Sequence, residues 1–325
     1  MTKTYSWFAR GVKPLRWALV ALIFLLCALL LDLGDVIDVF RRVSSSWILF
    51  IFVLMTVDRL LMAWKWSMLV EALEVKVSFV TAVRLYYLGT LAGIFLPSGL
   101  GGDLLRAHWL TKTTGATHKV YASLIMEKVI GFLSAANWAC IGLAVFLSQV
   151  DGIRPGWTAA LIMSLIVANG LFLLSLQSRM RDLIFRSFDI LPRLRITEFL
   201  QRVYDAYRQF GTKRSALLWN GLLTLAEHGL QLVVVLTMAT VLGLVQNVVL
   251  FLGVTAVYLL IYRLPISPDG WGVGEVASIG LYGLIGMSPE SAFSLAFFAH
   301  VMQIFVVLPG LCFLCPFEPV QSTQV

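Results

Sequence analysis

Apolar residues along the chain are gathered into long blocks, and short polar stretches separate each block from the next. An α-helix rises about 1.5 Å per residue, so about 20 mostly apolar residues cross the roughly 30 Å hydrocarbon core of a bilayer. The pattern predicts an all-α polytopic membrane protein with about eight membrane helices, since the alternating segments of about ten residues typical of a membrane β-barrel do not occur. The apolar blocks occupy residues 16–33, 47–70, 79–97, 120–148, 157–176, 215–242, 248–264, 272–287 and 291–315.

Composition supports the same class. Of the 325 residues, 59% are hydrophobic and only 13% are charged, whereas soluble domains carry about 45–50% apolar and about 25% charged residues. So few charges cannot cover the surface of a water-soluble protein, which excludes a soluble enzyme. We expect residues 1–325 to form a single integral membrane domain.

The net charge of +7 indicates orientation rather than nucleic acid binding. Four basic and no acidic residues precede the first block, and nine more basic residues lie within 177–214. Positively charged loops stay in the cytoplasm, so both segments are expected there. The spacing of apolar residues within 177–214 also predicts an amphipathic helix on the inner membrane surface, acting as a connector. The localisation expected is the inner (cytoplasmic) membrane, multi-pass, with both termini cytoplasmic.

Two segments interrupt the apolar blocks with Leu-Pro, glycines and an acid, each between two short apolar arms. Backbone groups freed by such a break persist in a membrane only where protein buries them or where they line a watery cavity. Paired breaks in two halves of a chain point to the binding site of a transporter. The residues are Pro97, Ser98, Gly101, Gly102, Asp103 and Arg106 in the first segment, and Arg263, Pro265, Gly272, Gly274 and Glu275 in the second.

The order of the blocks predicts how these segments lie. With the N-terminus inside, residues 79–119 make no net crossing, which fits a re-entrant hairpin from the cytoplasmic side. Residues 248–287 fit a second hairpin from the outside. Residues 1–176 and 215–325 would then be inverted half-repeats. Eight ordinary spans, with both apolar arms crossing, are the alternative.

Ionisable residues within the blocks are expensive in a membrane and are therefore candidates for function. Glu127 and Lys128 have an interfacial alternative, and Lys65 has the ordinary interpretation of snorkelling to the interface. His228 is either a neutral hydrogen-bonded residue or part of a proton relay. The intramembrane polar candidates are Asp58, Arg59, Glu227 and His228, beside Glu127 and Lys128 as substrate-binding candidates.

Metal and cofactor sites are not supported. Cys312 and Cys315 have redox or metal spacing, but no histidine lies nearby and small membrane-buried residues are the favoured interpretation. No histidine has the i, i+4 partner of a zinc-binding helix. We expect no cofactor.

Glycines before a short helix expose backbone N–H groups at its positive end, which suits an anionic headgroup such as phosphate. Arg106 and Arg263 could add charge-assisted hydrogen bonds to that phosphate. Asp103 and Glu275 have two interpretations, as caps of the short helices or as substrate contacts.

Three motifs resemble one known family. The signature at 96–106 resembles the first motif of the flippase-like membrane domain of lysylphosphatidylglycerol synthases, also called uncharacterised protein family 0104. Residues 123–131, with an acid–base pair before a glycine, are similar to its next motif, and residues 264–275 resemble its second hairpin. The first signature reads Leu96-Pro97-Ser98-x-x-Gly101-Gly102-Asp103-x-x-Arg106.

The resemblance implies flippase-like translocation or handling of a polar lipid, such as a phospholipid, an aminoacyl-lipid or a polyprenyl-linked glycolipid. In the synthases a separate cytoplasmic domain makes the aminoacyl-lipid, and since this chain ends at Val325, lysyl transfer is not expected. One position departs from the family, which usually has an arginine where Gly274 stands. Either Arg263 replaces that charge, or the substrate differs, or the site is weakened.

Two other functions stay open. A membrane-embedded transferase acting on a lipid or polyprenyl substrate would use Asp103 and Glu275 as acid or base, but the sequence shows no sizeable extramembrane domain. An accessory subunit of a lipid or glycan pathway is the third possibility. The partners expected are membrane lipids with an anionic headgroup and an enzyme of lipid or glycan synthesis, with no nucleic acid.

Overall fold

The computed structural model describes most of the chain, and every regular element in the described part is helical. The all-α prediction is therefore confirmed for these residues. The block predicted at 16–33 lies almost entirely outside them, as do Pro97, Ser98 and Pro265. The described ranges are 43–95, 101–149, 156–177, 195–264 and 266–314, with isolated positions between 25 and 41.

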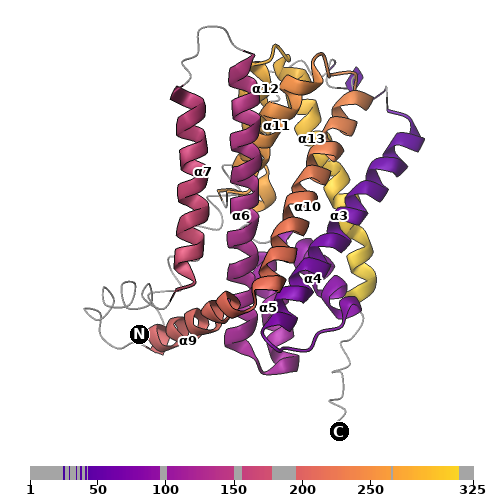
Figure 1. Ribbon diagram of the computed structural model, residues 1–325. Coiled ribbons are helices and arrows are strands. Elements are labelled where there is room, and N and C mark those ends of the chain that lie inside the picture. The colour runs from indigo at the N-terminus through magenta and orange to yellow at the C-terminus, as the bar shows by residue number, and fades with distance from the viewer. Residues whose placement is uncertain are drawn as a thin grey trace.

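Four helices are long and apolar enough to cross a membrane. They are α3 (Ser45–Ala72), α6 (Thr117–Ser148), α10 (Arg214–Val241) and the helix over Pro289–Phe313, which joins α13 (Pro289–Val307) to η3 (Leu308–Leu314). Together with α7 (Gly156–Ser175), they run along the long axis of the bundle in Figure 1. The chain is thus a multi-pass membrane protein, as its composition predicts.

Four shorter helices form two pairs. The first pair is α4 (Phe79–Phe95) and α5 (Gly101–Thr114), and the second is α11 (Val248–Tyr262) and α12 (Val273–Gly283). At about 1.5 Å per residue they extend roughly 16 to 26 Å, less than the hydrocarbon core of a bilayer. Figure 1 shows the α4–α5 pair at the lower end of the bundle and the α11–α12 pair at the upper end. The turn η2 (Pro268–Gly270) of the second pair contacts α4.

Glycines bring the backbones of neighbouring helices into direct contact. A Cβ atom added to Gly102 of α5 would lie 2.1 Å from the carbonyl oxygen of Gly89 in α4. At the crossing of α6 and α11, a Cβ atom on Gly142 would lie 2.5 Å from the carbonyl oxygen of Gly253. The structure therefore gives Gly102 a packing role that the sequence motif alone does not reveal.

An amphipathic helix, α9 (Arg195–Gln209), lies within the predicted linker and crosses the lower end of the bundle (Figure 1). Val203, Tyr207 and the following Phe210 are buried against residues of α3 and α6. The hydroxyl of Tyr204 donates to the carbonyl oxygen of Ser175 in α7 at 3.0 Å. These contacts pack α9 against α3, α6 and α7.

Candidate functional site

A cavity of about 840 Å³ lies among the helices, lined by residues of α3, α4, α5, α6, α9, α10, α11, η2 and α13. Its ionisable lining is balanced in formal charge, with five cationic and five acidic side chains. These residues are Arg59, Lys65, Arg106, Lys128 and Arg263, and Asp58, Asp103, Glu127, Glu227 and Asp269.

The cavity brings together charges from both halves of the chain. Two groups of predicted candidates line it: the in-span charges Asp58, Arg59 and Glu227, and Arg263 of the second interrupted segment. Of the other predicted site residues, some line the cavity and some do not. Gly102, Asp103, Arg106, Glu127 and Lys128 also line the cavity, whereas Gly101, His228, Gly272, Gly274 and Glu275 are not among its lining residues.

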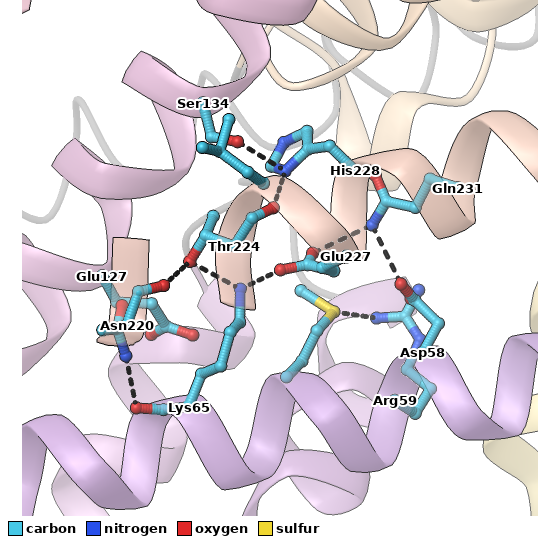
Figure 2. Close-up of polar contacts among 12 residues, drawn as sticks. Asp58, Arg59, Lys65, Glu127, Ser134, Asn220, Thr224, Glu227, His228 and Gln231 are labelled. Atoms are coloured by element: carbon cyan, nitrogen blue, oxygen red, sulfur yellow. Dashed lines mark hydrogen bonds and ion pairs between the residues drawn. The ribbon is translucent and has the colours of Figure 1, made fainter. Parts of the chain in front are cut away.

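Glu227 is the centre of a polar contact between α3 and α10. Its carboxylate pairs with Lys65 and accepts hydrogen bonds from Gln231 Nε2 at 3.0 Å and Arg263 Nη2 at 3.3 Å. Gln231 Nε2 also lies 3.3 Å from Asp58 Oδ1, so one amide bridges two carboxylates. Figure 2 shows the side chains of Lys65 and Asp58 extending from α3 toward α10.

Lys65 corrects the sequence-based interpretation. It does not snorkel to an interface, because it is only 4% exposed and pairs with Glu227. Its Nζ also donates to Thr224 Oγ1 at 3.0 Å, and its carbonyl oxygen accepts from Asn220 Nδ2 at 2.8 Å. One signal was available in the sequence: Lys65 follows Asp58 by seven residues, which places both on one helix face.

Arg106 is paired with two carboxylates, although its buried Nη1 has no hydrogen-bond partner among the described residues. Its Nη2 donates to Asp103 Oδ1 at 2.7 Å and to Glu127 Oε2, and its guanidinium lies between two aromatic rings. The ring centroids of Trp66 and Tyr86 are 4.5 Å and 4.3 Å from its central carbon. This side chain is 1% exposed. Its contacts connect α5 with Trp66 of α3, Tyr86 of α4 and Glu127 of α6.

Replacing Arg106 with lysine is expected to destabilise the protein by about 2–4 kcal/mol. The ammonium group keeps the charge but loses the two-point contact with Asp103 and the planar stacking on Trp66 and Tyr86. Thermal unfolding of the purified protein in detergent would measure the loss. Arg202→Lys, at an exposed position of α9, is the matched control. Equal melting temperatures for the two variants would contradict the role assigned to Arg106.

At the second interruption, Glu275 is a helix cap. Its Oε2 accepts the backbone N–H of Gly272 at 2.7 Å, and its Oε1 lies 2.9 Å from His300 Nδ1. Of the two interpretations offered by the sequence, capping is the one present in the structure. Asp103, by contrast, pairs with Arg106 and with Lys128, whose Nζ is 2.5 Å from Asp103 Oδ2.

Gly274 packs tightly against aromatic side chains. A Cβ atom there would lie 3.2 Å from His300 and 3.3 Å from Tyr262. Trp271 stacks on His300 from the same segment, with ring centroids 4.3 Å apart. Gly274 stands where the family usually has an arginine, and the rings of His300 and Tyr262 fill the space beside it. The Arg263 side chain pairs with Glu227 instead.

His228 connects α10 to α6. Its Nδ1 lies 2.7 Å from the carbonyl oxygen of Thr224 and 3.2 Å from Ser134 Oγ. The side chain is buried and is not part of the cavity wall. This geometry is that of the neutral, hydrogen-bonded interpretation.

Comparison with known proteins places these features in a family. Residues 15–310 match the family described as the lysylphosphatidylglycerol synthase TM region. No curated protein and no solved structure matches the chain significantly. The matched range includes the whole cavity lining and both interrupted segments. The chain therefore belongs to the lysylphosphatidylglycerol synthase TM region family.

Proposed function

We propose that this protein moves a polar lipid across the inner membrane, with the lipid headgroup in the cavity and the acyl chains in the bilayer. The cavity itself is the observation that carries the proposal. A charged residue at the centre of a membrane helix costs about 2.5–3.5 kcal/mol on insertion scales. Ten such side chains around one space indicate a compartment suited to a polar group.

The rim of the cavity supports a lipid rather than a water-soluble substrate. Five apolar residues line the cavity and are also 37–51% exposed, and four of them lie on α5, α6 and α9, which places an opening between these helices. Lys128 lies on the same rim, and its side chain is 42% exposed. An apolar rim with one cation suits acyl chains attached to a phosphate. The five residues are Leu104, Ile125, Phe132, Leu200 and Leu264.

The proposal includes an inverted-repeat architecture. Residues 1–176 and 215–325 would be the two halves, with α4–α5 and α11–α12 as re-entrant hairpins from opposite sides. The shortness of these helices and their places at opposite ends of the bundle support this arrangement over eight ordinary spans. Basic α9, at the end that holds α4 and α5, supports a cytoplasmic location for that end and for both termini.

Filling the cavity is expected to slow lipid translocation. Ala299 of α13 lines the cavity, and Ala299→Phe would occupy space that the headgroup needs. We expect the rate to fall by roughly tenfold or more, equivalent to about 1.4 kcal/mol or more in the barrier. The measurement is the loss of fluorescent headgroup-labelled lipid from the inner leaflet of reconstituted vesicles, followed with a membrane-impermeant quencher.

Ala160→Phe is the matched control, because Ala160 is exposed on α7 and does not line the cavity. Melting temperatures of both variants would establish that they are folded. Equal rates for wild type and Ala299→Phe would remove the cavity from the mechanism. Protein-containing vesicles that move no lipid faster than empty ones would remove the translocation function itself.

A further inference from the structure

Arg59 is the exception among the cations of the cavity. The other four each lie within 4.0 Å of a carboxylate: Lys65 and Arg263 of Glu227, and Arg106 and Lys128 of Asp103. Arg59 has no such partner in the part of the chain that the structure describes. Its Nη2 donates to the neutral Gln303 at 2.8 Å, and its buried Nε has no hydrogen-bond partner. Its Nη1 contacts only Met62 Sδ, at 3.7 Å, so Arg59 is the one cation of the cavity wall without a direct ion pair among the described residues.

Two carboxylates of the cavity also have no ion-pair partner among the described residues. Asp58 is 6% exposed, and its only hydrogen bond among the described residues is a long one from Gln231, at 3.3 Å. Asp269, in η2, has a buried Oδ2 without any hydrogen-bond partner. Neither acid lies within 4.0 Å of a cation among the described residues, although both line the same cavity as Arg59. A buried unpaired charge is costly unless something compensates it.

The turn that carries Asp269 has a defined backbone conformation and is held by a hydrogen bond. Asp269 has a left-handed backbone, with φ at 45°, and its carbonyl oxygen accepts from the Tyr262 hydroxyl at 3.0 Å. Nearby Ser267 lines the cavity and is 4% exposed, and its buried Oγ has no hydrogen-bond partner among the described residues. The second hairpin thus contributes to the cavity wall two side chains, Asp269 and Ser267, whose buried oxygens have no partner among the described residues, and Arg59 of α3 lines the same cavity.

We propose that Arg59, Ser267, Asp58 and Asp269 form the headgroup site, and that its ligand is a zwitterionic phospholipid with a primary ammonium group. The phosphodiester accepts from Arg59 and Ser267, and the ammonium donates to Asp58 and Asp269. This assignment rests on the proposed lipid translocation and names its substrate class. It also places the phosphate at Arg59, because Arg106 and Arg263 are already paired with carboxylates, whereas Arg59 has no ion pair among the described residues.

Charge selects this headgroup over its competitors. The ten lining charges sum to zero, so a neutral headgroup preserves the balance, whereas an anionic phosphatidylglycerol headgroup adds a negative charge beside two unpaired acids. A phosphocholine headgroup is also neutral, but its quaternary ammonium has no N–H to donate to the free Oδ2 of Asp269. The preference expected is ethanolamine over choline, and choline over glycerol.

The test is binding of short-chain lipids to the detergent-purified full chain, followed by calorimetry. The probes are dihexanoyl phosphatidylethanolamine, phosphatidylcholine and phosphatidylglycerol. We expect the ethanolamine lipid to bind about tenfold more tightly than the glycerol lipid. Asp269→Asn changes the side-chain size very little and should remove most of that preference. Arg59→Gln should weaken the binding of all three lipids. Arg202→Gln, on exposed α9, is the control, and melting curves verify folding.

Each outcome decides the assignment. Equal affinity of the wild type for the three probes would overturn it, as would an unchanged preference in Asp269→Asn. A loss in Arg59→Gln no larger than in Arg202→Gln would remove Arg59 from the site. Translocation in vesicles is measured separately. Selective binding without translocation would refute only the proposed function, and translocation without headgroup preference would refute only this site.

Discussion

Replacing Gly102 with alanine is expected to cost more than about 3 kcal/mol of stability, the upper end of what overpacking usually causes. The added Cβ would lie 2.1 Å from the carbonyl oxygen and 2.9 Å from the carbonyl carbon of Gly89. Both are backbone atoms, so no side-chain rotation relieves the clash and α4 must move away from α5. Arg106 lies one turn further along α5, so its pairing with Glu127 should be lost as well.

Thermal unfolding in detergent and the yield of monodisperse protein would measure this effect. The matched control is Gly280→Ala in α12, where no heavy atom lies within 4 Å of the added Cβ. That control should melt at the same temperature or higher, because alanine favours a helix over glycine by about 1 kcal/mol. Similar melting of the two variants would show that α4 and α5 can separate without loss, against the close contact described above.

Replacing Glu227 with glutamine is expected to destabilise the protein by about 3–5 kcal/mol, as removal of one partner of a buried ion pair does. Glu227 is 1% exposed and compensates both Lys65 and Arg263. The glutamine variant leaves these two cations without their carboxylate. Lys65→Met should cost less, because Glu227 would keep Arg263 and Gln231 as partners.

The order of these two variants is the decisive observation. In detergent, the free energy of unfolding of Glu227→Gln should be lower than that of Lys65→Met, and that of Lys65→Met should be lower than that of the wild type. Glu74→Gln is the matched control, since the Glu74 side chain is 74% exposed and its lysine pairs are worth less than about 1 kcal/mol. If Lys65→Met were the less stable of the two, Glu227 would not be the centre of the network.

Part of the site could be predicted from single residues. Asp58, Arg59, Glu127, Lys128 and Glu227 stand out because charges are rare in apolar blocks, and all of them line the cavity. Periodicity could have added more, since Asn220, Thr224, Glu227 and Gln231 share one face of their helix. Each of these inferences uses only information within one helix.

Partners between helices could not be predicted in this way. The sequence gives no reason for Lys65 to meet Glu227, because 162 residues separate them. It leaves Asp103 and Glu275 with the same two interpretations, although one pairs with Arg106 and the other caps α12. Nor does it single out Asp269, whose unpaired oxygen is visible only beside its neighbours in the folded chain.

The sequence by itself determined that this is an all-helical, multi-pass membrane protein of one family, with charges and Pro/Gly breaks in its membrane segments. Those features follow from hydropathy and helix geometry, which act over about 20 residues or fewer. The tertiary structure alone decided which charges are neutralised and which remain free. That outcome depends on how helices far apart in the chain cross, and at α4–α5 and α6–α11 the crossings are set by contacts of glycine backbones.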